Sequence, residues 1–192
     1  MLEKIRSFIS VDLEDKILVD ELKKMQQELK NAGADLKLVE AENMHLTLRF
    51  LGEILQPAVN AVIEELKSVK FTPFTLTLQG LGAFPSLHRI NVVWVGITDG
   101  KEQLKQIAEK IESLVRKVGF PPDSKGFSPH LTVARVRSGK NLAKLAEVLK
   151  ASKDYNVGSI TVGSVRLKRS TLTPKGPIYS TIFEVKAGGE HI

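Results

Sequence analysis

Residues 45–52 read HLTLRFLG, and residues 130–136 read HLTVARV. The chain therefore carries the phrase His-Leu-Thr-aliphatic twice, and this phrase accounts for two of its four histidines. Because alternate side chains of a strand share a face, the His and Thr of each copy point to one side and the aliphatic residues to the other. Each copy predicts a strand with one polar face and one core face.

The sequence around the two copies follows the same order of elements. In each half we expect a long amphipathic helix, the strand with the phrase, a shorter helix and a pair of strands. The expected helices lie within residues 13–33, 57–69, 101–119 and 141–152, and the expected strands within 6–13, 36–40, 44–52, 74–84, 90–97, 130–136, 155–172 and 179–187. Because strand pairs dominate, the pattern favours antiparallel sheets over a doubly wound parallel sheet.

The repeated order indicates an internal duplication. The repeat spans about 85–90 residues, which is longer than the unit of a solenoid. A chain of 192 residues fits one domain, or two small lobes that share a core. We therefore expect an α+β fold in which residues 1–192 form a single bilobal domain, with approximate lobes at 1–98 and 99–192. The first strand is expected to cross over and pair with the sheet of the second half.

The composition limits the classes of function. Hydrophobic residues make up 42% and charged residues 26% of the chain, as in an ordinary globular protein. The absence of cysteine excludes disulfides, thiolate metal sites and cysteine nucleophiles. No apolar run approaches the ~18–20 residues that span a bilayer, and the N-terminus lacks a secretory pattern, so we expect a cytoplasmic protein without a membrane partner. The net charge of +6 suits an anionic partner such as RNA, although solvated helix faces are the plainer explanation.

The two polar faces suit acid–base chemistry at phosphorus. If a two-fold axis relates the lobes, His45 and Thr47 meet their counterparts across one cleft, where His130 and Thr132 supply the second pair. An imidazole has an unperturbed pKa of about 6.5, so a neutral ring takes a proton from water and a protonated ring gives one to a leaving oxygen. Threonine hydroxyls donate to the non-bridging phosphate oxygens. Because the copies are almost identical, their chemistry alone does not decide which histidine is the acid.

Two other interpretations of the phrase compete with this one. A single copy is compatible with an ordinary strand, but its repetition at equivalent positions of both halves argues against that. A zinc site needs three or four ligands, whereas each copy offers one imidazole and no carboxylate on the same face, so we expect no metal and no cofactor. His88, in a loop, and His191, in the tail, have no partner phrase, and we expect both to be non-catalytic.

Several motifs resemble one known family. The phrases HLTLRFLG at 45–52 and FSPHLTVAR at 127–135, together with GAFPSLHRINVVWVGI at 82–97 and S-T-L-x-x-x-G-x-x-Y at 170–179, are similar to the RNA 2′,3′-cyclic phosphodiesterases. These enzymes, also called 2′-5′ RNA ligases, belong to the two-histidine phosphoesterase superfamily. The resemblance covers essentially the whole chain. The cysteine-free, Lys- and Glu-rich composition is similar to archaeal thermophilic members.

The resemblance implies a bilobal, pseudo-two-fold fold with two antiparallel sheets lining a central cleft and helices outside. It also implies hydrolysis of RNA 2′,3′-cyclic phosphate ends to 2′-phosphates without a metal or cofactor. In that reaction His130 is the proton acceptor that activates water, and His45 is the proton donor at the leaving 3′ oxygen. Thr47 and Thr132 bind the phosphate. The same groups, with roles exchanged, would join a cyclic phosphate to a 5′-hydroxyl in a 2′-5′ linkage.

The resemblance further implies that Phe50 and Arg135 contact the nucleobase. Each lies five residues after its histidine, and strict alternation places odd offsets on the core face. A bulge or strong twist would be needed to bring Phe50 to the cleft, and without one Arg49 would share the cleft face instead.

Other functions remain compatible with the motifs. One alternative is a phosphodiesterase for another small cyclic phosphate, and another is a non-catalytic RNA-binding module on the same fold. The partner implied by the leading hypothesis is RNA with 2′,3′-cyclic phosphate ends, for which tRNA fragments are one candidate source. We expect the chain to be a monomer.

Overall fold

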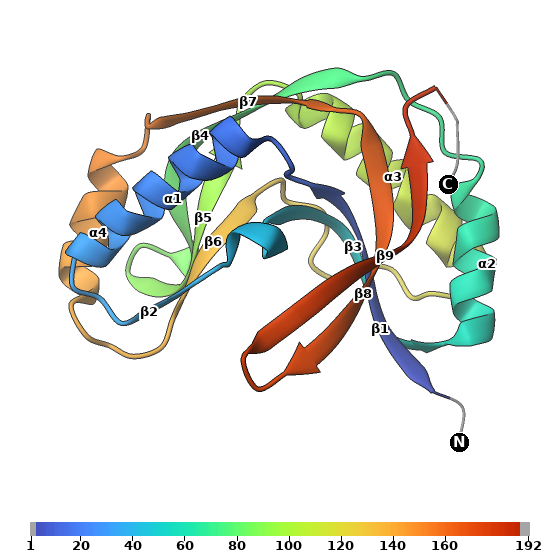
Figure 1. Cartoon of the computed structure of the whole chain (residues 1–192), viewed down its shortest axis with the longest axis horizontal. Helices are drawn as coiled ribbons and strands as arrows, with labels where there is room; N and C mark the ends of the chain where they lie inside the picture. The colour runs from blue at the N-terminus through green and yellow to red at the C-terminus, as the bar shows by residue number, and fades with distance from the viewer. Residues whose placement is uncertain (1–2, 189–192) are drawn as a thin grey trace.

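The computed structural model of the chain describes residues 3–188 (Figure 1). Its helices are α1 (Lys16–Asn31), α2 (Gln56–Leu66), α3 (Lys101–Lys117) and α4 (Leu142–Ala151), with one 3₁₀ turn, η1 (Ala41–Asn43). Its strands are β1 (Lys4–Asp12), β2 (Leu36–Leu38), β3 (His45–Leu55), β4 (Phe74–Ser86), β5 (Arg89–Ile97), β6 (Leu131–Val136), β7 (Asn156–Val162), β8 (Ser164–Thr173) and β9 (Gly176–Lys186). His191 lies outside the described residues. No described helix is both long and apolar enough to cross a membrane.

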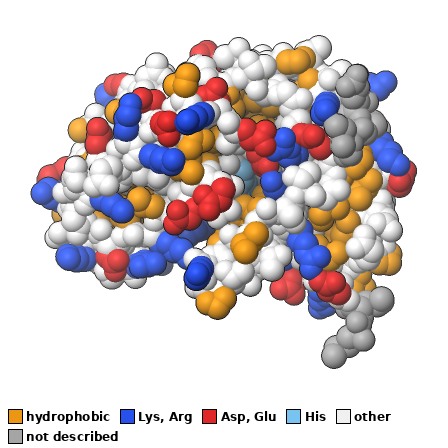
Figure 2. Space-filling model, in the orientation of Figure 1, with side chains coloured by type: hydrophobic (Ala, Val, Ile, Leu, Met, Phe, Trp, Pro, Cys, Tyr) orange, Lys and Arg blue, Asp and Glu red, His pale blue; other side chains and the backbone are white. Residues whose placement is uncertain are grey.

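Two antiparallel sheets form the framework, as the sequence predicted. Sheet A has the strand order β3-β1-β8-β9, and sheet B has the order β2-β6-β5-β4-β7. Helices α1 and α4 contact strands of sheet B, whereas α2 and α3 contact β3 of sheet A, so the helices cover the outer faces (Figure 1). The inner faces of the sheets turn toward each other. Figure 2 shows a hollow between them with a histidine at its floor.

The first helix shows how local sequence sets these elements. The carboxylate of Asp15 accepts a hydrogen bond from the backbone N–H of Leu18 at 2.8 Å, which caps the helix. Leu18, Leu22, Met25 and Leu29 recur near the helical period and are all buried. The helix ends where expected, because Gly33 adopts a φ of 72°, a left-handed conformation that glycine tolerates best.

One predicted strand is wrong in its extent. Residues 155–172 do not form a single strand, because the chain leaves sheet B after Val162 and enters sheet A at Ser164. Each sheet buries one face, so Val162 and Val165 are both buried and the apolar pattern contains no mark of the change of sheet. The predicted hairpin through residues 173–177 is confirmed, since β8 and β9 pair along their whole length.

Each motif strand contains a bulge directly after its threonine. In β3 the pairing with β1 steps from Ser10↔Thr47 to Ile9↔Arg49, so Leu48 is an extra residue. In β6 the pairing with β5 steps from Trp94↔Thr132 to Val93↔Ala134, and Val133 is the extra residue there. A bulge makes two successive side chains face the same side and thereby shifts the alternation of the residues that follow.

The bulge changes the predicted place of Arg49. Strict alternation would put this side chain on the cleft face, but it is buried on the opposite face, beneath sheet A. Its Nε lies 2.7 Å from Glu112 Oε2 on α3, and its terminal nitrogens donate to the backbone carbonyls of Phe50 and Pro121. Arg49 therefore ties the bulged strand to α3 and to the loop that leads to the second motif.

We predict that Arg49→Leu destabilises the protein by about 2–4 kcal/mol, because the substitution leaves Glu112 as an unpaired, partly buried charge. Adding Glu112→Gln removes that charge and should recover part of the loss. Urea unfolding of the single and double variants measures both effects. A double variant no more stable than Arg49→Leu would show that the ion pair does not fasten the bulge.

Candidate active site

His45 begins β3 and is fixed by two hydrogen bonds. Its Nδ1 lies 2.7 Å from the backbone carbonyl oxygen of Asn43, and its Nε2 lies 3.0 Å from the hydroxyl of Thr47. A carbonyl oxygen only accepts, so Nδ1 carries a proton. In the neutral ring, Nε2 therefore holds the lone pair and accepts the Thr47 hydroxyl proton.

His130 is held in the same way immediately before β6. Its Nδ1 lies 2.6 Å from the carbonyl oxygen of Ser128, which repeats the two-residue offset seen at Asn43 and His45. Within residues 3–188 the Nε2 atom of His130 has no hydrogen-bond partner. The duplicated backbone thus favours the same tautomer in both imidazoles, with the proton on Nδ1 and the lone pair on Nε2.

The two motif strands meet where the sheets approach each other. Strands β3 and β6 are in contact although they belong to different sheets (Figure 1). Thr47 is exposed and Thr132 is half-buried, and each shares the face of its histidine. The two strands that carry these four residues are therefore neighbours in the structure.

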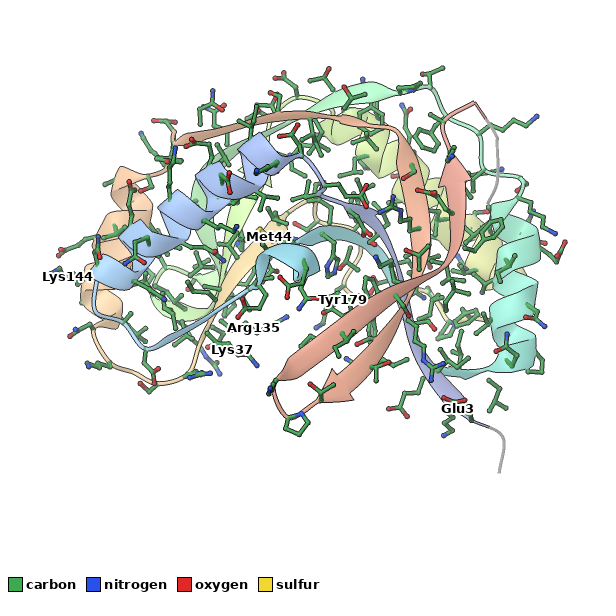
Figure 3. All side chains as sticks on the ribbon, viewed as in Figure 1. Glu3, Lys37, Met44, Arg135, Lys144 and Tyr179 are labelled. Carbon is green, nitrogen blue, oxygen red and sulfur yellow. The ribbon has the colours of Figure 1, made fainter. Side chains whose placement is uncertain are left out.

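The bulges also bring the two outlying candidates to this face. Phe50 pairs with Phe8 of β1, and Thr47 pairs with Ser10, so Phe50 and Thr47 share one face of sheet A. Phe50 is 43% exposed, which a core position would not allow. Arg135 is exposed in the equivalent place on β6 (Figure 3). The conflict with alternation disappears because each strand gains one residue between the threonine and the candidate.

Two aromatic rings lie against the imidazole of His45. The Phe8 ring lies 4.7 Å from the imidazole centroid, and Tyr179 of β9 lies 5.2 Å away, edge-on. Burial lowers the pKa of His45, although the Asn43 carbonyl and the Asp12 carboxylate act in the opposite direction. The ring is therefore neutral in the free protein near pH 7. His130 has one such neighbour, the edge-on ring of Phe84 at 4.8 Å.

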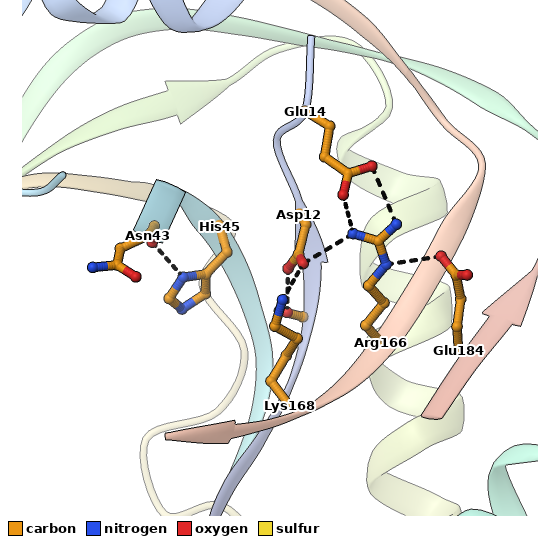
Figure 4. A network of polar contacts seen from close by, with 8 residues as sticks. Asp12, Glu14, Asn43, His45, Arg166, Lys168 and Glu184 are labelled. Atoms are coloured by element: carbon orange, nitrogen blue, oxygen red, sulfur yellow. Dashed lines mark hydrogen bonds and ion pairs between the residues drawn. The ribbon is translucent and has the colours of Figure 1, made fainter. Parts of the chain in front are cut away.

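A charged network lies beside His45 on the same face of sheet A (Figure 4). Asp12, the cross-strand partner of His45, accepts from Lys168 Nζ at 2.5 Å and from Arg166 at 3.1 Å. Burial raises the pKa of Asp12, but the bonds to Lys168 and Arg166 outweigh it and hold the pKa below its usual value. Asp12 therefore stays charged, and Arg166 links it onward to Glu14 and Glu184.

The sequence did not indicate that Asp12 and Lys168 lie beside His45. The Lys168 side chain is only 12% exposed and pairs with Asp12. Asp12 and Lys168 are 156 residues apart in the chain, and only the pairing of β1 with β8 brings them together. Trp94 pairs with Thr132, and its ring lies against Gly82, where a Cβ would meet the indole at 2.2 Å. The absence of a side chain at Gly82 leaves the space that the Trp94 ring occupies.

Within residues 3–188, no group of three or more His, Cys, Asp or Glu side chains is placed to hold a metal ion. The groups at this face include the imidazoles of His45 and His130, the hydroxyls of Thr47 and Thr132, and the nearby Asp12 and Lys168.

The comparison with known families decides the membership of the chain. A family model described as LigT like Phosphoesterase matches it twice, over residues 13–94 and 95–179. The chain belongs to the LigT-like phosphoesterase family. Each of the two matches contains one HLT phrase, so the duplication inferred from the motifs coincides with the repeat of the family.

Relatives and solved structures agree with this assignment. The chain is 42% identical over 170 residues to an RNA 2′,3′-cyclic phosphodiesterase of Aeropyrum pernix, covering 88% of this chain and 97% of the relative. It is 40% identical over 181 residues to the protein of that name in Methanothermobacter thermautotrophicus, covering 92% and 96%. Escherichia coli LigT superposes with a TM-score of 0.78 in its apo form and 0.77 complexed with 3′-AMP, at 25% identity, covering 96% of this chain and 98% of LigT.

We predict that His45 titrates below the ordinary imidazole value of about 6.5 in the free protein. Its burial between Phe8 and Tyr179 disfavours the charged ring, so the folded state loses stability as pH falls through the lowered pKa. NMR titration of the imidazole nitrogens measures the midpoint and shows whether Nδ1 carries the proton. A midpoint at or above 6.5 would contradict the prediction.

Variants of the charged network test the physical cause. Asp12→Asn removes a negative charge and should lower the pKa of His45 further, whereas Lys168→Met removes a positive charge and should raise it. Both variants break the same ion pair, so a merely structural effect would move the pKa in the same direction in each.

Proposed function

We propose that this chain hydrolyses RNA 2′,3′-cyclic phosphate ends to 2′-phosphates by acid–base catalysis with His45 and His130, without a metal ion. One observation carries the proposal: both imidazoles bind a backbone carbonyl through Nδ1, which makes Nε2 the reactive atom in each. The names of the archaeal relatives, RNA 2′,3′-cyclic phosphodiesterase, supply the substrate class.

In the proposed reaction, the free Nε2 of His130 takes a proton from water, and the water oxygen bonds to phosphorus. The bond from phosphorus to the 3′ oxygen breaks in line with the attack, and Nε2 of His45 donates a proton to that oxygen. The hydroxyls of Thr47 and Thr132 donate to the non-bridging oxygens. Phe50 and Arg135 hold the base by stacking.

The donor role requires that His45 gain a proton, because its pKa is lowered in the free protein. A bound phosphate brings a negative charge beside the ring, and a nearby negative charge favours the imidazolium. Asp12 acts in the same direction. Protonation also ends the acceptance from Thr47, which frees its hydroxyl to donate to the substrate phosphate instead.

The equal tautomers favour a second activity at the same centre. Either imidazole can serve as acid or base, so the site could also join a cyclic phosphate to a 5′-hydroxyl in a 2′-5′ linkage. The strained ring supplies the driving force, and no ATP is needed. Incubation with RNA that carries both kinds of end, followed by mapping of the junction, separates ligation from hydrolysis.

We predict that His45→Ala and His130→Ala each lower kcat on a nucleoside 2′,3′-cyclic phosphate by about 10²–10⁴-fold, with EDTA present. The double variant should be little worse than either single one, because the two rings act as a unit. His88→Ala is the matched control, since His88 is exposed in a turn outside the site. Wild-type turnover by either single variant would rule out the mechanism, and RNA binding without turnover by the wild type would favour a binding module.

A modified substrate tests the assignment of roles. Sulfur in place of the 3′ oxygen leaves as a thiolate, which needs less protonation because thiols are more acidic than alcohols. If His45 is the acid, this substrate restores much of the rate of His45→Ala and little of that of His130→Ala. The reverse result would exchange the two roles.

A further inference from the structure

A pocket of about 240 Å³ opens on sheet A where β1 and β8 separate. The two strands pair only from Ser7 to Ser10 of β1, so Lys4 and Arg6 lie beyond the paired region. These two residues line the pocket from β1, and Ser170 and Leu172 line it from β8. The pocket lies outside the two-histidine centre.

The pocket is continuous with the face that carries His45. Lys4, Arg6, Phe8 and Ser10 alternate along β1 and therefore share that face. Arg6 is four residues from Ser10, the partner of Thr47, which corresponds to ~13 Å at ~3.3 Å per residue. A nucleic-acid strand that leaves the phosphate site can reach this distance within one or two nucleotides.

Phe50 and Arg6 lie between the two-histidine centre and the pocket. The Arg6 guanidinium carbon lies 4.6 Å above the centroid of the Phe50 ring. Burial raises the pKa of Tyr179, while the charges of Arg135 and Arg6 act in the opposite direction. Tyr179 in turn contacts the His45 ring. Cationic and aromatic groups thus follow one another from the centre to the pocket.

The charge of the pocket suits a phosphate group. Among residues 3–188, neither Lys4 nor Arg6 forms an ion pair, in contrast to Arg166 and Lys168, whose charges are matched by carboxylates. Glu53, the cross-strand partner of Arg6, is the single acidic residue of the pocket lining. Leu172 is 68% exposed and offers an apolar surface for a base.

We propose that this pocket is a second nucleotide subsite, in which Lys4 and Arg6 bind a backbone phosphate about one or two nucleotides before the cyclic phosphate end of a single-stranded RNA. The proposal rests on the function proposed above, because the same strand occupies both places. It follows that the enzyme acts more efficiently on the end of an oligonucleotide than on a mononucleotide.

The test compares adenosine 2′,3′-cyclic phosphate with the tetranucleotide that ends in the same group. Lys4→Met should reduce the kcat/KM ratio of tetranucleotide to mononucleotide by about three- to tenfold, since it removes one charge-assisted phosphate contact. For the tetranucleotide, kcat/KM falls with rising salt, and Lys4→Met should make this dependence shallower. The magnitude of the slope of log(kcat/KM) against log salt should decrease by about 0.7. Glu53→Gln should change the ratio in the opposite direction, because it removes a repulsive charge from the pocket.

Lys144→Met is the charge-matched control, because Lys144 is exposed on α4, on the far side of sheet B (Figure 3). If Lys144→Met lowers the ratio as much as Lys4→Met does, or if Lys4→Met leaves the ratio unchanged, the subsite is overturned while the proposed hydrolysis stands.

Binding of a fluorescein-labelled tetraadenylate with a 3′-phosphate separates the two proposals. One outcome would reject the proposed function and support the pocket. In that outcome the wild type turns over neither substrate, Lys4→Met binds the probe more weakly than the wild type does, and Lys144→Met binds it equally well. Equal affinity of the wild type and Lys4→Met for the probe would overturn the pocket.

Discussion

The extra residue that follows each threonine is the constraint on which the site depends. Without it, Phe50 and Arg135 would turn away from the histidines, and Arg49 and Ala134 would face the cleft instead. The bulge makes Leu48 and Arg49 face inward together, and the ion pair of Arg49 with Glu112 compensates the burial of a charged group. The geometry of the cleft therefore rests on an interaction beneath the sheet.

The electrostatics of the two halves differ although their backbone geometry is the same. Both histidines bind a carbonyl oxygen two residues earlier. Only His45 lies between two aromatic rings and beside the pair of Asp12 and Lys168. A duplicated strand thus supplies two equivalent imidazoles, and the surrounding strands make them chemically distinct. Any division of labour between acid and base must come from those neighbours, because the phrase itself is the same.

Much of this arrangement could be predicted from local pattern, and the remainder depends on distant pairing. Alternation within HLTL and HLTV was sufficient to group His45 with Thr47 and His130 with Thr132, because each pair is two residues apart on one strand. The bulges were not readable from periodicity, since Leu48 and Val133 look like ordinary core residues. The change of sheet at Gly163 could not be predicted for a similar reason, because the alternation of apolar residues continues from one sheet into the other. The contact of Asp12 with Lys168 joins the two ends of the chain, and no local pattern encodes it.

The position of β1 between β3 and β8 has a consequence for folding during synthesis. Ser7 pairs with Arg169, so β1 is synthesised long before the strand that pairs with it. Such distant pairing slows folding, because a long loop must close before the contact is gained. Sheet A cannot close on a nascent chain that ends before β8, and His45 until then lacks Tyr179 and the network around Asp12. A truncated translation product would therefore carry both HLT phrases and still lack a finished cleft.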